Sequence, residues 1–157
     1  MYYLGLDVGS SSVKAALVEA KSGKSIQSVH EPKNEMSISS LKNDWAEQDP
    51  NVWWKYTCTA IKRVCKESNI DPKKIISIGI SYQMHGLVIV DKNGEPLRDS
   101  IIWCDSRAVN IGNDAYEKLG EDKCMTHLLN SPGNFTASKL KWVKENEPEV
   151  YEKIYKY

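Results

Sequence analysis

The sequence predicts an α/β protein with a mixed sheet and flanking helices. Apolar residues alternate with others in three consecutive segments within residues 2–29, which is typical of β-strands. A segment with helical spacing follows at about 50–67, and a branched apolar segment lies at 75–81, so strands come before and after a helix. No G-x-G-x-x-G motif follows the first strand, and strands and helices do not alternate regularly. The order therefore does not match a Rossmann fold.

The first elements predicted are a hairpin and a third strand. Apolar residues alternate on both sides of a serine-rich turn that begins at Gly9, so residues 2–20 predict a β-hairpin. A third strand is expected around 26–29. The polar residues of 31–50 predict an exposed loop.

The next two elements have clear boundary signals. Asp49-Pro50 is typical of a helix start, and apolar residues recur at helical spacing to about residue 67. Asp71-Pro72 opens a unit in which the isoleucines of 75–81 predict a buried strand.

The remaining elements are short. Residues 87–90 predict a strand that the turn dipeptide Asn93-Gly94 closes. Helices are expected at 105–119 and 136–145, and a last helix near Pro148.

Charge and composition exclude several classes of function. Lys+Arg and Asp+Glu both count 21, and this balance argues against nucleic-acid binding, which requires a clustered basic excess. The N-terminus has no basic and apolar signal pattern, and no apolar run approaches a membrane span. We therefore expect a soluble, cytoplasmic protein that binds neither nucleic acid nor membranes. The four cysteines contain no C-x-x-C pair, which argues against a zinc site or a disulfide framework.

The turn after the first strand is a candidate phosphate-binding site. Gly9 lets the backbone approach a ligand and adopt unusual dihedrals, and the serine amides and hydroxyls can donate to phosphate oxygens. A lysine returns on the second strand as a positive charge. The candidate phosphate-binding residues are Gly9, Ser10, Ser11, Ser12 and Lys14. An ordinary serine-rich hairpin is the simpler interpretation of this motif in isolation.

Asp7 is the reason to predict a metal ion at the hairpin. A carboxylate about 4 Å from a phosphate oxygen is repelled by roughly 4 kcal/mol at a near-surface dielectric constant. An acid at this position is therefore expected to act with Mg²⁺ between the two groups, bound through coordinated water. The hairpin predicts a metal–nucleotide ligand, with Asp7 as its catalytic and metal-binding residue.

Polar and aromatic side chains after the later strands predict a sugar site. Gln83 and His85 offer hydrogen-bonding groups for a polyol, and Met84 offers an adaptable apolar wall. Gly86 lets the chain turn. Trp103 could stack on a sugar face, and two charged residues near it could bind hydroxyl groups. The candidate substrate-binding residues are Gln83, Met84, His85, Trp103, Asp105 and Arg107. The simpler alternative for the last three is a packed aromatic ring and a surface ion pair, worth at most about 1 kcal/mol.

Four motifs in order carry a family resemblance. They are Asp7-x-Gly9, Trp45-x-Glu47-Gln48-Asp49-Pro50, Gln83-Met84-His85-Gly86 and Trp103-x-Asp105-x-Arg107. Together they resemble the FGGY carbohydrate kinases, and within that family the xylulokinases most. The segments Ser131–Ala137 and Lys139–Val143 resemble the same group.

The resemblance implies an RNase H-like fold of the actin, hexokinase and sugar kinase type. It also implies ATP and Mg²⁺ as cofactors and transfer of the γ-phosphoryl group to the 5-hydroxyl of D-xylulose. Residues 1–157 would then be the N-terminal part of the first kinase domain. The rest of that domain, the catalytic base and the nucleotide domain would be absent. We accordingly expect a truncated chain that is inactive alone and that self-associates through uncovered apolar surface.

Several alternatives remain at this point. The substrate could be another sugar or polyol, such as gluconate, ribulose or glycerol. The chain could also be a non-catalytic sugar-binding module, or a separate phosphate-binding domain.

Overall fold

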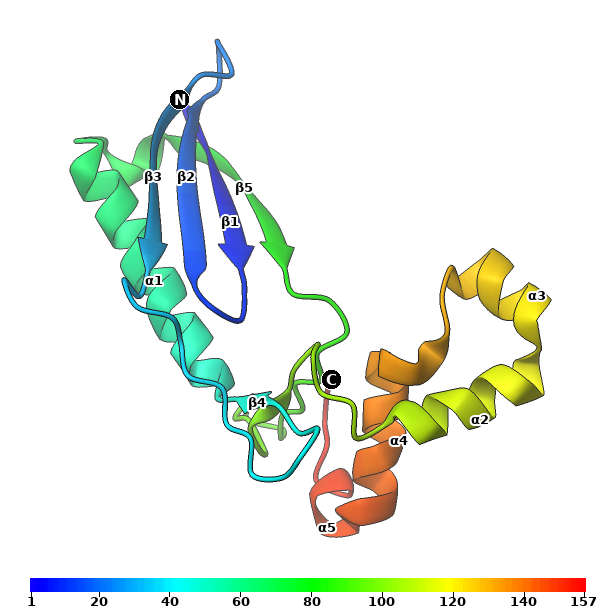
Figure 1. Ribbon diagram of the computed structural model, residues 1–157. Coiled ribbons are helices and arrows are strands. Elements are labelled where there is room, and N and C mark those ends of the chain that lie inside the picture. The colour runs from blue at the N-terminus through cyan, green and yellow to red at the C-terminus, as the bar shows by residue number, and fades with distance from the viewer. The chain divides into compact units, whose positions relative to one another are not determined.

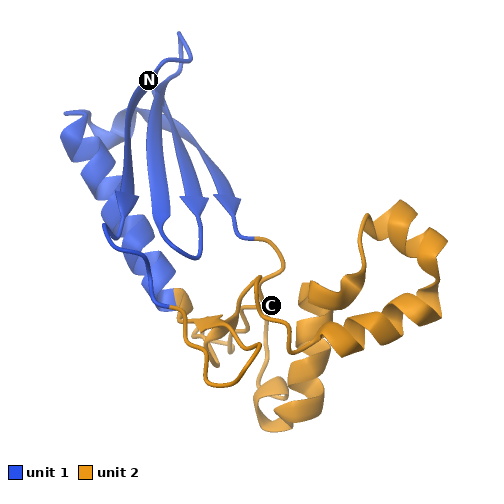
Figure 2. Ribbon diagram, in the orientation of Figure 1, with its two compact units in different colours: residues 1–37, 51–83 blue, residues 38–50, 84–157 orange.

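The computed structural model describes all residues, 1–157, and divides them into two compact units (Figure 2). Unit 1 comprises residues 1–37 and 51–83. Unit 2 comprises residues 38–50 and 84–157. Each unit is described separately below.

Unit 1 is a four-stranded mixed sheet with one long helix (Figure 1). Its elements are β1 (Tyr2–Val8), β2 (Val13–Glu19), β3 (Ser25–Glu31), α1 (Pro50–Glu67), the 3₁₀ turn η1 (Pro72–Lys74) and β5 (Ile75–Tyr82). The strand order is β3-β2-β1-β5. The first three strands pair antiparallel, and β5 pairs parallel with β1. The predicted hairpin, third strand and helix are therefore confirmed.

The core of unit 1 lies between the sheet and α1. Alternate side chains of each strand point to the same face, and on one face they are the apolar residues that pack against α1. The buried cluster is Leu4, Leu6, Val13, Ala15, Leu17, Val29, Ala60, Val64 and Cys65. Burial raises the pKa of the Cys65 thiol, so this cysteine acts as a small apolar residue.

The prediction that β5 is a buried strand is wrong. β5 lies at the edge of the sheet, and its register pairs Leu4 with Ile78 and Leu6 with Ile80. Ile78 and Ile80 thus continue the apolar face of β1, but they remain exposed, with Ile80 64% exposed, and only Ile75 is partly buried against the core. Branched apolar residues indicated the strand correctly, but they did not determine whether anything covers it.

Unit 2 joins a two-stranded sheet to a set of short helices. Its elements are β4 (Glu47–Gln48), β6 (Ser100–Ile101), α2 (Val109–Leu119), α3 (Glu121–Lys123), the π-helical turn η2 (Cys124–Leu128), the 3₁₀ turn η3 (Pro132–Asn134), α4 (Thr136–Asn146) and α5 (Pro148–Tyr151). Leu87, Ile89, Ile101 and Val143 form its apolar core. The predicted helices at 136–145 and near Pro148 are confirmed.

One prediction for unit 2 is wrong, and one differs in its boundary. Residues 87–90 form only isolated bridges, in which Val90 pairs with Pro96, and a proline has no N–H to extend a ladder. The helix expected at roughly 105–119 is present, but it begins later, at Val109, because the Asp105 carboxylate accepts a hydrogen bond from the Arg107 amide and holds a turn there. The β4–β6 pair and the π-helical turn were not predicted.

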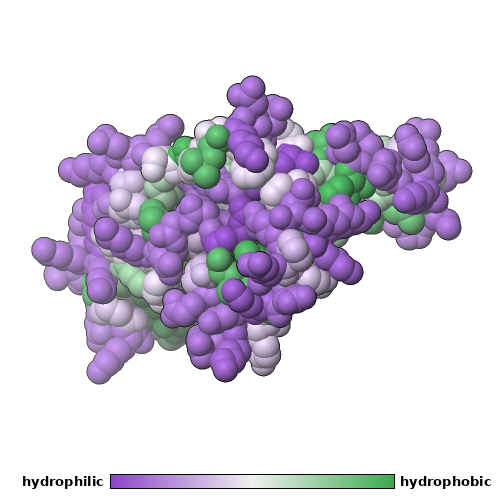
Figure 3. All heavy atoms as spheres, turned by 90° about the horizontal axis from the view of Figure 1, so that it is seen from below, coloured by the Kyte–Doolittle hydropathy of each residue, from purple (hydrophilic) through white to green (hydrophobic).

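The structure contains no helix with both the length and the apolar character needed to cross a membrane. Hydrophilic residues cover most of the face shown in Figure 3, and apolar residues appear there in separate patches.

Candidate functional site

Asp7 and Lys14 lie opposite each other on β1 and β2. They are register partners, and the Lys14 Nζ atom is 3.3 Å from the Asp7 Oδ2 atom. Strand alternation directs both side chains away from the face that packs on α1. The Asp7 side chain is 45% exposed. The carboxylate is therefore open to a ligand and has a cation beside it.

Gly9 shapes the turn between these strands. Its amide donates to the Ser12 carbonyl at 3.1 Å, and a Cβ atom at Gly9 would lie 3.1 Å from the same oxygen. Gly9 has no positive φ, so the expectation of unusual dihedrals is wrong. A side chain there would need the Ser12 carbonyl to move by a few tenths of an ångström, so the turn favours glycine. The amide of Met36 also donates to the Ser11 carbonyl at 2.9 Å, which holds the turn from outside.

The carboxyl ends of β1 and β5 meet beside this turn. Asp7 is paired with Ser81, and the Gln83 amide donates to the Val8 carbonyl at 3.0 Å. In α/β proteins, ligands bind at the carboxyl ends of parallel strands. The side-chain nitrogen and oxygen of Gln83 are buried without a hydrogen-bond partner. A buried amide in this state is costly, and a polar ligand would satisfy it.

His85 has a strained backbone in unit 2. Its φ is +62°, in the left-handed region that costs a non-glycine residue about 1–3 kcal/mol. Its ring stacks on Phe135 at 4.7 Å between centroids and an interplanar angle of 13°. The turn was expected at Gly86, but His85 is the residue with positive φ. The preceding residue, Met84, is 67% exposed and free to contact a ligand.

Trp103 is the exposed aromatic residue of the Trp-x-Asp-x-Arg segment. It is 49% exposed, so its ring could contact a ligand. Its carbonyl accepts a hydrogen bond from the side-chain amide of Asn134. The Asn134 Oδ1 atom is buried without a partner.

Asp105 and Arg107 are buried in an ion-pair network. The Arg107 side chain is 1% exposed and lies 2.7 Å from both the Asp105 and the Glu47 carboxylates. The Ala46 amide also donates to the Asp105 Oδ2 atom at 2.6 Å. The pair is therefore buried, unlike the surface pair considered as the simpler alternative. Its charged atoms bind protein groups in this structure.

Aromatic rings enclose the same network. The Arg107 guanidinium lies 3.7 Å from the Trp45 ring centroid and 4.9 Å from that of Trp142. Arg98 also belongs to the network, since it pairs with Glu47 and, at 2.7 Å, with Glu147. These contacts compensate the buried charges, which would otherwise be costly.

Lys139 is a fully buried lysine beneath the sugar-site residues. Its Nζ atom donates to the His85 carbonyl at 2.7 Å and to the Ile102 carbonyl at 2.9 Å. Burial lowers the pKa of Lys139 to about 8, and nearby Arg107 contributes in the same direction, while Asp105 and Cys104 act against it. The buried amine therefore bonds mainly to carbonyl oxygens.

Four residues around the site were not among the predicted site residues. Phe135, Asn134 and Lys139 fall in segments whose resemblance had been noted, but nothing local indicates that they contact residues far away in sequence. Gly112 is the fourth. A Cβ atom there would lie 2.2 Å from the Gly133 Cα, so α2 packs directly on the backbone of η3 and holds the segment that precedes Phe135.

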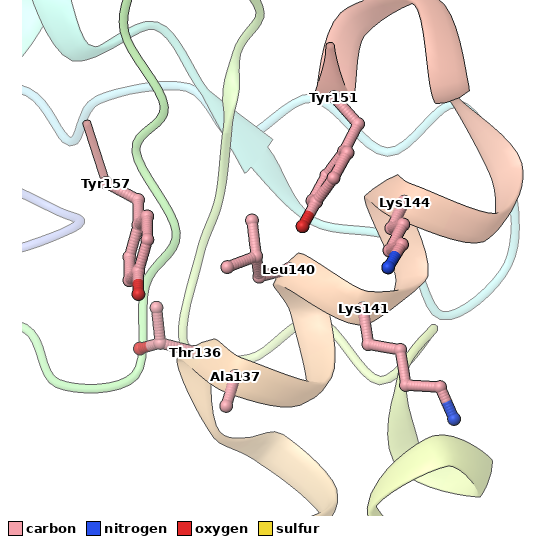
Figure 4. Close-up of a pocket in the computed structure, with 7 residues that line it drawn as sticks. All are labelled: Thr136, Ala137, Leu140, Lys141, Lys144, Tyr151 and Tyr157. Atoms are coloured by element: carbon pink, nitrogen blue, oxygen red, sulfur yellow. The ribbon is translucent and has the colours of Figure 1, made fainter. Parts of the chain in front are cut away.

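The outer side of α4 lines a separate hollow of about 420 Å³ (Figure 4). Its lining residues are Thr136, Ala137, Leu140, Lys141, Lys144, Tyr151 and Tyr157. Lys141 is exposed and lies 3.5 Å from Glu145. Two lysines only two positions apart on α4 thus have opposite environments, since Lys139 is buried and Lys141 faces solvent.

Comparison with known proteins relates both units to one family. The model of the FGGY family of carbohydrate kinases, N-terminal domain, matches residues 2–157. The xylulose kinase of Bacillus subtilis is 36% identical over 157 residues, which cover 97% of this chain and 30% of that protein. The chain therefore spans about three tenths of the length of its curated relatives.

Solved structures agree in fold. A xyloylose kinase of Brucella ovis superposes with a TM-score of 0.86 at 34% identity over 99% of this chain and 32% of that one. A gluconate kinase of Lactobacillus acidophilus gives a TM-score of 0.81 at 28% identity over 98% and 30%. The predicted α/β fold of the actin and hexokinase type is confirmed. By sequence and by structure, this chain belongs to the FGGY family of carbohydrate kinases.

Proposed function

We propose that residues 1–157 supply the phosphate hairpin and the sugar loop of an ATP-dependent kinase whose substrate is D-xylulose. The observation that carries the proposal is the exposed Asp7–Lys14 pair at the carboxyl end of β1, in a chain 36% identical to a xylulose kinase. In the proposed reaction, the 5-hydroxyl oxygen bonds to the γ-phosphorus and loses its proton to a base or to solvent. The bond from that phosphorus to the β–γ bridging oxygen breaks, and ADP leaves.

The hairpin side chains have distinct proposed roles toward the nucleotide. Lys14 places a positive charge beside the phosphates, and the hydroxyls of Ser10, Ser11 and Ser12 donate to phosphate oxygens. Gly9 keeps the turn tight, since its own amide is bonded to Ser12. Catalysis of this kind depends on positioning and on compensating charge.

Asp7 fits a magnesium ion that arrives with the nucleotide. Mg²⁺ in kinases is held by one or two carboxylates together with phosphates and water, and Asp7 offers one partly exposed carboxylate. No group of three or more His, Cys, Asp or Glu residues could hold a metal ion here. We therefore assign Asp7 as the protein's contact to Mg²⁺, which would offset the negative charge of the phosphates.

The sugar would contact the loop that follows β5. Gln83 offers a buried side-chain amide without a hydrogen-bond partner. His85 offers a ring that stacks on Phe135, and Met84 offers exposed apolar surface. Trp103 offers a half-exposed ring for the C–H face of a sugar.

Asp105 and Arg107 are assigned to the same proposed site, but with an indirect role. Their charged atoms pair with each other and with Glu47. We propose that they shape the pocket beside Trp103, and that any direct bond to a sugar hydroxyl would have to compete with these pairs.

A substrate panel tests the proposed activity. The full polypeptide that the gene encodes is purified, and ADP release is followed with Mg-ATP and D-xylulose, gluconate, ribulose or glycerol. We expect the highest kcat/KM with D-xylulose. Preference for gluconate, in line with the Lactobacillus relative, would change the assigned substrate. The absence of turnover with every sugar would favour a non-catalytic sugar-binding module.

Asp7→Ala is expected to abolish turnover, because the metal–phosphate contact is lost. The control is Lys21→Ala, an exposed change in the turn at the other end of β2, which should leave kcat within about twofold. An Asp7→Ala variant with kcat near the wild-type value would refute the role of Asp7.

His85→Ala is expected to reduce kcat/KM for the sugar by an amount equivalent to roughly 1–3 kcal/mol, the value of one polar bond. The KM for Mg-ATP should stay unchanged. Steady-state kinetics with each substrate varied separately measures both. Unchanged sugar kinetics would show that His85 has no role in sugar binding.

A further inference from the structure

The start of α4 contacts both segments of the proposed sugar site. Asn134 bonds to the Trp103 carbonyl, and the Phe135 ring stacks on His85. The Thr136 hydroxyl donates to the Gly86 carbonyl at 3.2 Å. These three consecutive residues and Lys139, one turn later on the same helix, are called the α4 clamp below.

Lys139 is the member of the clamp that joins the two segments directly. Its Nζ atom contacts the His85 carbonyl and the Ile102 carbonyl, and these two residues precede Gly86 and Trp103. The first segment contains the strained φ of His85. A backbone in this region persists only where its surroundings hold it there, and a buried cation bonded to its carbonyl is such a restraint.

We propose that Lys139 is a positioning residue for sugar binding, which holds the His85 loop and the Trp103 segment at a fixed separation. This inference rests on the proposed function, since it assigns a purpose to the spacing of two sugar-site segments. The hydrogen bonds that Lys139 donates both go to the carbonyls of sugar-site segments, so its effect is expected on the sugar. An apolar core residue could fill the same volume, but it could not donate to two carbonyls.

The first test is Lys139→Met in the full polypeptide, with Lys141→Met as the matched control on the exposed side of α4. The substitution removes the two hydrogen bonds that the Lys139 ammonium group donates. We expect kcat/KM for the sugar to fall at least about tenfold and the KM for Mg-ATP to stay within about twofold. The control should match the wild type for both. Equal losses for both substrates, or wild-type sugar kinetics, would overturn the proposal.

The second test does not depend on activity. Hydrogen exchange is measured at the amides of Leu87 and Ile101, which bond to each other's carbonyls across the two held segments, and at the amide of Asp105, which bonds to the Ile102 carbonyl. Lys139→Met should accelerate exchange there, with β1 and β2 unchanged. Faster exchange would support the clamp even if no sugar were turned over. Unchanged exchange in a folded variant would refute it whatever the substrate proves to be.

A third variant covers the case in which Lys139→Met does not fold. Thr136→Val keeps the shape of the side chain but removes its bond to Gly86. We expect the sugar KM to rise about threefold, as for one neutral hydrogen bond, and exchange to quicken at Leu87 but not at Asp105. A sugar KM equal to that of the wild type would then overturn the proposal.

Discussion

Lys139 lies in an environment that differs strongly from that of an ordinary, exposed lysine. Full burial removes its ammonium group from water, and two carbonyl oxygens replace the hydration. The charged groups that act on it are Asp105 and Arg107, with the Cys104 thiol as a third titratable neighbour. Desolvation is the largest effect, so the folded protein holds the proton of Lys139 less tightly than the unfolded chain does.

The lowered pKa of Lys139 predicts a pH-dependent stability. Below pH 8 the amine is charged in both states, and the folded state bears the cost of burying it. Between about pH 8 and the unfolded value of about 10.4, only the unfolded chain keeps the proton. The free energy of unfolding should therefore rise with pH in this window, by up to about 1.4 kcal/mol per unit.

Urea unfolding of the wild type and of Lys139→Met between pH 7.5 and 9.5 measures this effect. The wild type should gain stability relative to the variant as the pH rises, because methionine has no proton to release. Other groups titrate equally in both proteins and cancel in the difference. A difference that does not change with pH would mean that the pKa of Lys139 is near its ordinary value.

The buried ion network connects β4 to the segment that leads into α2. Glu47 lies on β4, and Arg107 and Asp105 follow β6. The Ala46 amide adds a bond to Asp105, and the Ile102 amide adds one to the Ala46 carbonyl at 3.1 Å. The two very short strands are thus joined by side-chain contacts as well as by their ladder.

Arg107→Met should destabilise the folded chain by about 3–5 kcal/mol, because it leaves the buried Asp105 and Glu47 carboxylates without this cation. The control is Lys141→Met, whose exposed pair with Glu145 is worth at most about 1 kcal/mol. Urea unfolding at pH 7 compares the two. A loss below about 1 kcal/mol for Arg107→Met would mean that the network contributes little to stability.

Unit 1 has an apolar edge strand with exposed side chains. The outer backbone of β5 has no strand beside it, and its apolar side chains on the α1 face of the sheet are exposed. These are Ile78, Ile80 and Tyr82. An edge strand with such a face is a template for pairing with another chain.

We therefore predict that this 157-residue chain self-associates through β5, and that the Ile78→Lys, Ile80→Lys double variant is monomeric, because two charges on this face oppose pairing. The control is Leu41→Lys, which changes an exposed apolar residue outside unit 1. Sedimentation velocity over a concentration series distinguishes them. A wild-type chain that stays monomeric at every concentration would contradict the prediction.

Local patterns were enough to predict most elements of the fold. The hairpin, α1 and α4 follow from periodicity and from turn or cap residues that act within a few positions. The candidate residues Asp7, Lys14 and Gln83 were identified in the same way, since they directly adjoin a strand end. The short β4–β6 pair was missed, because two-residue strands have too few residues to show an alternation.

Only the tertiary structure determines which side chains are buried and which contacts form between distant segments. Lys139 bonds to carbonyls 54 and 37 positions away, and Arg107 is buried because two tryptophans from other segments enclose it. The same kinds of residue, lysine and arginine, are exposed in most sequences. Periodicity determines which way a side chain points along its own element. Whether another element then covers it depends on packing between distant segments, which no local pattern encodes.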